Sequence, residues 1–313
     1  MISTRRSFLI TGATGFVGGA VTVAALRAGH GPRLLLLSRA LSDQSARSRL
    51  FDNLRRLGAT DRELGTLGHD CILEADLADA DAFSRSRQLD AIERVIHAAA
   101  LPTFSHNPSI ASINVDGTLA LARALNHDHL RRFLFVGTAM AVGPSLRRGS
   151  VIDESMDLGA EEDHLVPYTA SKAQAERRLR LELPDLPLVV ARPSIVVGHT
   201  QLGVTPSQSI FWVFLVGHML GAFTCELEDF IDVIPADWCA NVLLQLATLD
   251  HLGHDVYHVS AGRESSVTID EIDQALSRAR CVPPIADQYR KVTKEDLASL
   301  LPRLKRIAPE ANR

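Results

Sequence analysis

Ser7-Phe8-Leu9-Ile10-Thr11-Gly12-Ala13-Thr14-Gly15-Phe16-Val17-Gly18-Gly19 is the stretch that decides the fold. An apolar run, Phe8–Ile10, stops at Thr11, and glycines then follow at three-residue intervals. An apolar segment of helical length, Val17–Leu26, comes next, and Gly29 is placed to end it. The stretch therefore predicts a strand, a tight turn and a helix.

The three glycines suit a dinucleotide-binding turn. Gly12 permits the turn, Gly15 lets the backbone approach a pyrophosphate, and Gly18 lets the helix pack closely on the strand. The helix N-terminus presents free N–H groups and a partial positive charge to the phosphates. The spacing is GxxGxxG and not the usual GxGxxG, so a glycine-rich turn without a ligand is the alternative. Its position at the first strand of the chain favours the dinucleotide.

Composition limits the partners that the chain can have. Its 313 residues, 46% of them hydrophobic, suit one large domain or one domain with a smaller companion. The longest apolar stretch, Ile210–Phe223, is interrupted by two glycines and a histidine, so we expect no membrane span. A net charge of −4 and a pI near 6.3 give no general attraction to nucleic acid, and we expect no such partner.

Cysteine usage and the first residues indicate a reduced, cytoplasmic protein. The four cysteines are Cys71, Cys225, Cys239 and Cys281. No two of them are spaced as CxxC, so we expect neither a bound metal nor a disulfide framework. Arg5 and Arg6 before an apolar run are similar to a twin-arginine export signal, but export would remove the glycine turn.

Short apolar runs alternate with segments of helical length, such as Ile110–Leu125. The predicted strands are Ser7–Thr11, Arg33–Ser38, Asp70–Glu74, Arg94–Ala98, Arg132–Gly137, Leu188–Ala191 and a seventh near Asp255–Ser260. Most are continuously apolar, as parallel strands covered on both faces are. The pattern predicts an α/β fold, a doubly wound (Rossmann) parallel sheet with a smaller C-terminal substrate-binding lobe. We assign residues 1–195 to the dinucleotide-binding domain with the catalytic residues. Residues 196–313 form mostly the lobe, with at least one strand, at about 255–260, returning to the sheet.

The end of the second strand favours NADPH as the cofactor. An NAD-specific site usually has a carboxylate there, about 20 residues past the glycines, to hold the ribose 2′-hydroxyl. This chain has Ser38 and Arg39, a hydroxyl and a cation that suit a 2′-phosphate. An ordinary surface arginine is the alternative, and the nearby Asp43 leaves NAD(H) open.

Two further strand ends offer contacts to the adenosine. Asp76, after the third strand, can accept a hydrogen bond from the adenine amino group or cap a helix, and Asp79 can share either role. We interpret His97, at the end of the fourth strand, as a packed residue and not a base. Three small residues after it leave room for a ribose to lie on the backbone: Ala98, Ala99 and Ala100.

Tyr168 and Lys172 carry the strongest catalytic signal. Residues four apart on a helix share one face. The pKa of tyrosine, near 10, is too high for acid–base catalysis at neutral pH, and a nearby ammonium lowers it by favouring the phenolate. Lys172 can also hydrogen-bond the nicotinamide ribose. The YxxxK spacing occurs by chance on many helices, but its place after a nucleotide-binding turn favours catalysis.

Two more residues complete the predicted active site. Thr138 follows the fifth strand, and its hydroxyl would donate to the substrate carbonyl oxygen as hydride arrives. Its neighbour Gly137 has no side chain to do so. Asn114, on the helix before that strand, is expected either to support Lys172 through its backbone or a water, or to be structural.

With these residues identified, the chain resembles the extended short-chain dehydrogenases/reductases, the epimerase/dehydratase-like group, over nearly its whole length. The shared features are Thr11–Gly18, Asp76, His97–Ala100, Asn114–Thr118, Thr138, Tyr168 and Lys172. A narrower similarity is to the fatty acyl-CoA reductases and to the thioester-reductase domains of carboxylic acid reductases and peptide synthetases. It lies in Ser38–Ala40, Ser42–Leu50, Arg192–Gly198, Asp232–Trp238 and Tyr257–Ser260.

The resemblance implies NADP(H), with NAD(H) less favoured, and reduction of an acyl thioester or a related lipophilic aldehyde or ketone. It places Arg39 near the 2′-phosphate. The other cofactor contacts that it implies are Thr11, Gly12, Thr14, Gly15, Phe16, Val17, Gly18, Ser38, Asp76, Leu77, Ala98, Ala99, Ala100, Tyr168, Lys172, Pro193, Ser194 and Ile195. The chain departs from the family at Gly137, where serine commonly precedes the catalytic threonine. We recognise no carrier or adenylation domain, so we expect the thioester to arrive on CoA or on a separate carrier protein.

The acyl pocket has no recognisable motif. Residues 202–229, which shape that pocket in the family, match no pattern that we can place. The apolar residues there either line a lipophilic tunnel or, as we favour, form a buried core helix. They are Phe211, Trp212, Phe214, Leu215, Met219 and Phe223.

Two other functions remain alternatives. The first is a nucleotide-sugar epimerase or dehydratase that recycles tightly bound NAD within each turnover. The second is a non-catalytic NAD(P) sensor, against which the acid–base set of Thr138, Tyr168 and Lys172 argues. A homodimer is an expectation from the family alone.

Overall fold

The computed structural model describes residues 6–83, 86–103, 107–143, 151–164, 166–203, 211–285, 288–293 and 296. The chain forms two compact units. The first combines Met1–Thr205 with Ile234–Val259, and the second combines Pro206–Val233 with Ser260–Arg313. The sequence-based division at residue 195 follows chain order, whereas in the structure the segment Ile234–Val259 comes back to the first unit.

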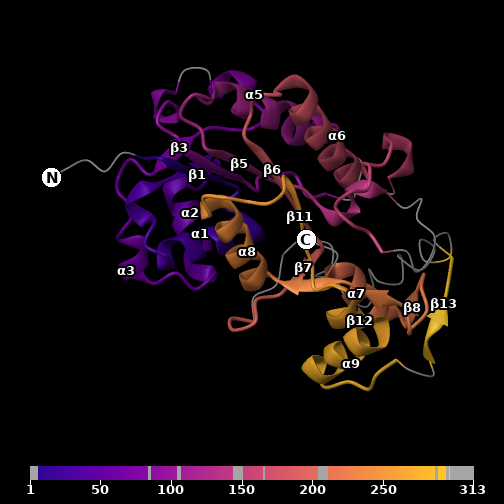
Figure 1. The fold of residues 1–313 in the computed structure, drawn as a ribbon. Helices are drawn as coiled ribbons and strands as arrows, with labels where there is room; N and C mark the ends of the chain where they lie inside the picture. Colours follow the sequence, from indigo (N-terminus) through magenta and orange to yellow (C-terminus); the bar gives the residue numbers. More distant parts are fainter. Residues whose placement is uncertain are drawn as a thin grey trace. The chain divides into compact units, whose positions relative to one another are not determined.

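A parallel sheet of seven strands forms the centre of the first unit (Figure 1). The strands are β1 (Phe8–Thr11), β2 (Leu34–Ser38), β3 (Ile72–Glu74), β4 (Arg94–His97), β5 (Arg132–Val136), β6 (Leu188–Pro193) and β11 (Val256–Val259). Their order across the sheet is β11-β6-β5-β4-β1-β2-β3. The predicted doubly wound fold is confirmed, and the crossover between β1 and β4 is the switch point where such sheets bind ligands.

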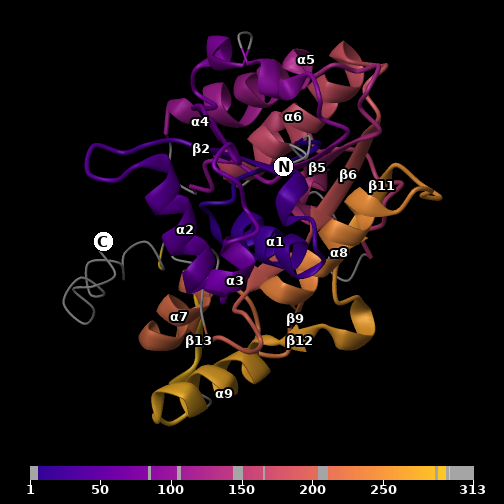
Figure 2. The ribbon, with the colours of Figure 1, turned by 90° about the vertical axis from the view of Figure 1, so that its left-hand side faces the viewer.

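Helices cover both faces of this sheet, which explains the continuously apolar strands. Alternate strand residues such as Leu9 and Phe133 pack in one buried cluster with Leu119 and Leu179 of the helices on one face. On the other face lie α1 and α8, which contact each other and the strands (Figures 1 and 2). The covering helices are α1 (Phe16–Arg27), α2 (Ala46–Arg56), α3 (Asp61–Leu64), α4 (Ser109–Ala111), α5 (Gly117–Ala124), α6 (Pro167–Glu182) and α8 (Ala236–Thr248).

The helix expected at Ile110–Leu125 is not continuous. Its middle, Ser112–Asp116, is a π-helical turn between α4 and α5. Such turns widen the helix and recur at functional sites. Here the turn contains Asn114, one of the predicted active-site residues.

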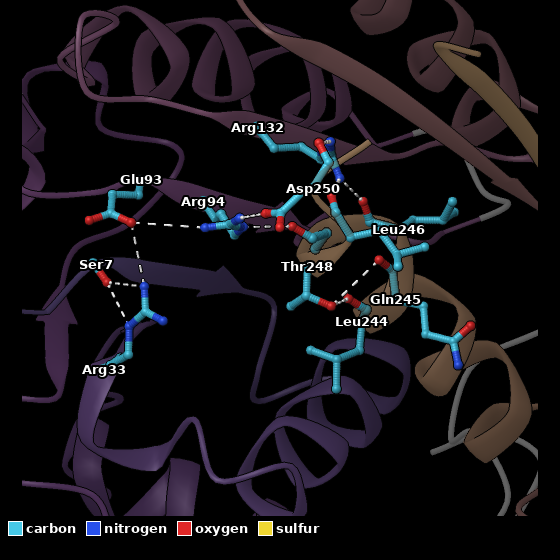
Figure 3. A network of polar contacts seen from close by, with 12 residues as sticks. Ser7, Arg33, Glu93, Arg94, Arg132, Leu244, Gln245, Leu246, Thr248 and Asp250 are labelled. Carbon is cyan, nitrogen blue, oxygen red and sulfur yellow. Dashed lines mark hydrogen bonds and ion pairs between the residues drawn. The ribbon is translucent and has the colours of Figure 1, made fainter. Parts of the chain in front are cut away.

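Two arginines at the amino ends of β4 and β5 hold the end of α8 (Figure 3). Arg132 Nη1 donates to the Leu246 carbonyl at 2.7 Å, and Arg94 Nε donates to that of Ala247 at 3.1 Å. Arg94 also pairs with Asp250 at 3.2 Å. Carbonyls of the last helical turn have no partner within the helix, so these cations stabilise the helix end.

The second unit is small and mixed. Its elements are α7 (Phe211–Leu220), β8 (Ala222–Phe223), β9 (Phe230–Ile231), β12 (Val267–Thr268), α9 (Ile269–Arg280) and β13 (Arg290–Lys291). Phe214, Leu220 and Phe223 are buried, which agrees with the core helix favoured from the sequence. The side chains of residues 211–213 lie outside the described part. Among the described helices, none combines the length and the hydropathy that crossing a membrane requires.

Candidate functional site

A sharp turn connects β1 to α1 and leaves no room for side chains. Gly12 has a φ of +78°, a left-handed conformation that favours glycine. A Cβ at this position would lie 2.7 Å from the Ala99 nitrogen. A Cβ on Gly18 would lie 2.4 Å from the Gly12 carbonyl oxygen. Both positions therefore accept only glycine.

The turn has the donors that a pyrophosphate requires. Gly15 is the exposed N-cap of α1, and no described side chain caps this helix end. The N–H groups of Phe16, Val17 and Gly18, in the first turn, have no acceptor within the helix. The positive end of the helix dipole lies at the same place. Thr14 lies in the turn, half-buried. The residues present therefore fit the pyrophosphate of a dinucleotide.

Asn53 of α2 fastens this turn, and the sequence analysis missed it. Its Nδ2 donates to the carbonyl oxygens of Ala13 and Gly15, each at 2.9 Å. A Cβ on Gly19 would lie 2.6 Å from the same Nδ2, so Gly19 makes room for the amide. An asparagine in the middle of an otherwise ordinary amphipathic helix is the only sign of this role in the sequence.

Two arginines and one carboxylate gather where β2 and β3 end. Arg39 Nη1 lies 2.5 Å from Asp76 Oδ2, and Arg49 Nη1 donates to the Arg39 carbonyl at 3.2 Å. Burial, and then the charge of Arg39, lower the pKa of Arg49. The cluster carries an excess of one positive charge, which suits a phosphate at the edge of the site. Arg49 was not among the predicted contacts.

The structure turns Ser38 away from this cluster. Its side chain is buried, and its hydroxyl donates to the Ala46 carbonyl at 3.0 Å. Asp76 also accepts from the Ala78 nitrogen at 3.0 Å, which fixes the carboxylate at the edge. Leu77 is buried beside it. Ser38 thus shapes the loop between β2 and α2, and the polar groups at this edge include the exposed Arg39 and Glu74 and the half-buried Asp76.

Thr138, Tyr168 and Lys172 come from elements that adjoin at one edge of the sheet. Thr138 follows β5, and the other two lie on α6, which packs against the turn after Thr138. The Thr138 hydroxyl oxygen accepts from the Met140 nitrogen at 3.3 Å, so the hydroxyl keeps its hydrogen for another partner. Lys172 is buried, with Nζ 4.5 Å from the centre of the Phe135 ring.

The acid–base pair does not titrate as expected. Burial raises the pKa of Tyr168 to about 12, the opposite of the predicted lowering. Burial also lowers the pKa of Lys172 to about 7. Desolvation, the cause of both shifts, disfavours the charged form of each group. At neutral pH Tyr168 is therefore a protonated phenol.

Asn114 contacts α6, the helix of Tyr168 and Lys172, by a different route from the one predicted. Its Oδ1 accepts from the Leu101 nitrogen at 2.7 Å, and its Nδ2 donates to Ser171 Oγ at 2.9 Å. Ser171 Oγ in turn donates to the Tyr168 carbonyl at 2.7 Å. The side chain thus reaches α6 beside Lys172, through Ser171.

The segment after β6 borders the same edge of the sheet. The Ser194 nitrogen donates to the Val259 carbonyl at 3.0 Å, which ties this segment to β11. Ser194 Oγ is buried without a hydrogen-bonding partner among the described residues. Pro193 is buried and Ile195 half-buried. An unpaired buried hydroxyl beside a predicted nicotinamide site is consistent with a polar ligand group there.

Comparison with known proteins places this site in a family. The family model described as "Male sterility protein" matches residues 10–243. "Probable fatty acyl-CoA reductase 5" of Arabidopsis thaliana is 25% identical over 87% of this chain and 70% of its own length. "Fatty acyl-CoA reductase wat" of Drosophila melanogaster is 25% identical over 77% of this chain but only 54% of its own. The terminal R domain from the myxalamid PKS-NRPS pathway has a TM-score of 0.74 at 24% identity, covering 89% of this chain and 71% of that domain.

Proposed function

The chain belongs to the family described as "Male sterility protein", and we propose that it uses NADPH to reduce an acyl thioester. It is an NAD(P)-dependent oxidoreductase of the extended short-chain dehydrogenase/reductase type. One observation carries the proposal: the family match at residues 10–243 includes the glycine turn, Thr138, Tyr168 and Lys172. The curated relatives are named for fatty acyl-CoA reduction, which supports a thioester as the substrate.

The active-site residues suit the direction of reduction. Bound NADPH supplies the hydride that adds to the thioester carbonyl carbon. As the C=O π electrons move onto oxygen, the Thr138 hydroxyl donates a hydrogen bond to that oxygen and the Tyr168 phenol gives it a proton. Loss of the thiol from the resulting hemithioacetal leaves an aldehyde. A phenol with a pKa raised by burial holds its proton at neutral pH until the oxygen takes it.

The charges at the edge of the site support NADPH over NADH. Arg39 and Arg49 supply two guanidinium groups against the single carboxylate of Asp76. A 2′-phosphate would compete with Asp76 for Arg39, because charge-assisted hydrogen bonds to phosphate are strong. The same carboxylate is available to hold a ribose hydroxyl of NADH. The choice of cofactor is therefore tested by comparing the KM values for NADPH and NADH.

Absorbance of NADPH with a panel of acyl-CoAs, aldehydes and ketones tests the function. We expect oxidation that requires a thioester and that Tyr168→Phe lowers at least a hundredfold, with NADPH affinity kept. Tyr257→Phe is the matched control. Oxidation with ketones alone would discard the thioester, and a purified protein that holds NAD and consumes no NADPH would favour the nucleotide-sugar alternative.

A further inference from the structure

The buried histidine at the end of β4 lies in the middle of a hydrogen-bond chain. His97 is completely buried. Its Nδ1 lies 2.9 Å from Thr11 Oγ1, and its Nε2 lies 2.8 Å from Thr118 Oγ1. Thr11 ends β1 immediately before the glycine turn, and Thr118 lies on α5. One imidazole therefore bridges the cofactor turn and the helix layer behind it.

The partner at Nε2 determines which nitrogen carries hydrogen. Thr118 Oγ1 donates its single hydrogen to the Asn114 carbonyl at 2.8 Å. It therefore accepts from His97, so Nε2 is protonated. Burial, and then the charge of Lys172, lower the pKa of His97 to about 3. The ring is neutral at physiological pH, and Nδ1 carries no hydrogen.

The partner at Nδ1 agrees with this tautomer. An unprotonated Nδ1 accepts from the Thr11 hydroxyl. The Thr11 oxygen in turn accepts from the Ala99 nitrogen at 3.1 Å. Hydrogen bonds thus run in one direction, from Ala99 through Thr11, His97 and Thr118 to the Asn114 carbonyl.

The chain continues to the catalytic helix. The Asn114 amide donates to Ser171 Oγ at 2.9 Å, and Ser171 donates to the Tyr168 carbonyl at 2.7 Å. A second contact runs through an aromatic ring. His97 stacks on Phe135, with ring centroids 6.1 Å apart, and Lys172 Nζ lies over the same ring. A charged imidazole here would repel the ammonium of Lys172.

We propose that His97 is a positioning residue, a neutral imidazole protonated on Nε2 that holds the glycine turn and the catalytic helix in register. Its role extends the earlier interpretation of a merely packed residue. The consequence for NADPH binding rests on the proposed function, whereas the tautomer follows from the protein alone. Lys172 is the charged group near the imidazole, across the Phe135 ring.

The tautomer is tested in the protein without cofactor. We expect the ¹⁵N spectrum of labelled histidine to contain one signal set, lost in His97→Gln, with Nε2 protonated, Nδ1 unprotonated and no change from pH 5 to 8. A titration within that range, or hydrogen on Nδ1, would overturn the proposal. If His97→Gln does not fold, the set is identified among the 12 histidines as the one whose signals shift in Thr118→Val, which removes the partner of Nε2.

Variants of Thr118 test the coupling, because this residue is outside the proposed cofactor contacts. We expect Thr118→Val to raise the NADPH Kd and lower kcat, each about tenfold, and Thr118→Ser to restore both. Thr22→Val is the matched control, since Thr22 is equally buried and donates to the Gly18 carbonyl at 2.8 Å, one turn back, as Thr118 does to Asn114. It should lower Tm without changing Kd.

The outcomes separate this proposal from the proposed function. A Thr118→Val protein that loses only Tm, with wild-type Kd and kcat, would reduce His97 to a packing residue and refute the coupling. If the wild-type chain binds no NADPH at all, the proposed function fails. The ¹⁵N measurement of the His97 tautomer, which needs no cofactor, then tests the proposed role of His97 alone.

Discussion

Two ionisable side chains on one helix, the half-buried Tyr168 and the buried Lys172, have pKa values that desolvation moves in opposite directions. The pKa of Tyr168 rises to about 12, and that of Lys172 falls to about 7. Both shifts favour the uncharged form. At neutral pH the phenol thus holds the proton that reduction consumes, and the lysine gains or loses a proton with little free-energy change.

The lowered pKa of Lys172 makes stability depend on pH. The unfolded lysine has a pKa of 10.5 and the folded one about 7, so between these values the unfolded chain binds more protons. Stability therefore rises with pH in this window. We expect the wild type without cofactor to gain about 2 kcal/mol from pH 7 to 9 relative to Lys172→Met, at about 1.4 kcal/mol per unit. Urea unfolding at both pH values measures it, and equal changes in the two proteins would refute the shift.

Arg39 is the residue that we expect to select the cofactor. In Arg39→Ala a bound 2′-phosphate would lose one of the two guanidinium groups at this edge and face the unpaired carboxylate of Asp76, with Arg49 remaining. The KM for NADPH should rise about thirtyfold, while that for NADH stays within about twofold. Arg27→Ala, which removes an arginine paired with Glu63 at 3.2 Å elsewhere on the surface, is the control. Equal losses for both cofactors would show that Arg39 does not contact the phosphate.

We expect Asn53 to affect the binding of the cofactor pyrophosphate and not the binding of the 2′-phosphate. Asn53→Asp replaces a donor to two carbonyl oxygens with an acceptor, which repels them and opens the turn. We expect the Kd values for NADPH and NADH to rise equally, about tenfold or more. The affinity for 2′-AMP, which has no pyrophosphate, should remain unchanged. A loss confined to NADPH, or an equal loss for 2′-AMP, would contradict this role.

At the scale of the element, the turn between β1 and α1 places the helix end at the site. Gly18→Ala would set a Cβ 2.4 Å from the Gly12 carbonyl oxygen, a backbone atom that cannot move without shifting the helix. We expect a loss of about 3 kcal/mol in stability and at least tenfold in NADPH affinity. Gly29→Ala is the control: φ is +82° and no atom lies within 4 Å of the added Cβ. It should cost about 1 kcal/mol and leave the NADPH Kd unchanged.

The seven strands of the parallel sheet were predictable from sequence to within two residues at each end. Each is a short, continuously apolar run, the pattern typical of parallel strands that helices cover on both faces. The π-helical turn at Ser112–Asp116 was not predictable, because local sequence gives a continuous helix and the Asn114 contacts to Leu101 and Ser171 come from distant segments. The hydrophobic pattern of the sequence thus predicts the strands, whereas the π-helical turn depends on tertiary contacts.

The sequence predicted the features of the candidate site that depend on residue type. It did not predict those that depend on the orientation or burial of a side chain. The glycines at 12 and 18 have the conformation and close contacts that the motif requires. Ser38 has the right residue type at the strand end, but its side chain points inward to Ala46. The pKa of Tyr168 is raised and not lowered, because burial, which the sequence does not report, disfavours the phenolate.

At the scale of the whole molecule, the chain is divided into two units that are not successive in sequence. Helix α8 and strand β11 return to the first unit after the chain has entered the second. Within the second unit, His218 Nδ1 of α7 donates to Asp273 Oδ1 of α9 at 2.6 Å, and Asp273 Oδ2 accepts from the Ile285 nitrogen at 2.9 Å. Asp273 is buried, so both contacts are protected from water.

This buried carboxylate gives a test of whether the two units unfold separately. Asp273→Asn cannot accept from both donors, because one of its two polar atoms is now itself a donor. We expect a loss of about 2 kcal/mol confined to the second unit, which is about thirtyfold faster hydrogen exchange in α7 and α9. Amides of β4 and β5 should exchange at the wild-type rate. Asp270→Asn, on the same helix, is the control, since among the described residues its carboxylate accepts a hydrogen bond from Gln274 alone, at 2.6 Å. Equal acceleration in the sheet would mean that the units unfold as one body, and the second unit would then be as stable as the first instead of a more easily opened part of the molecule.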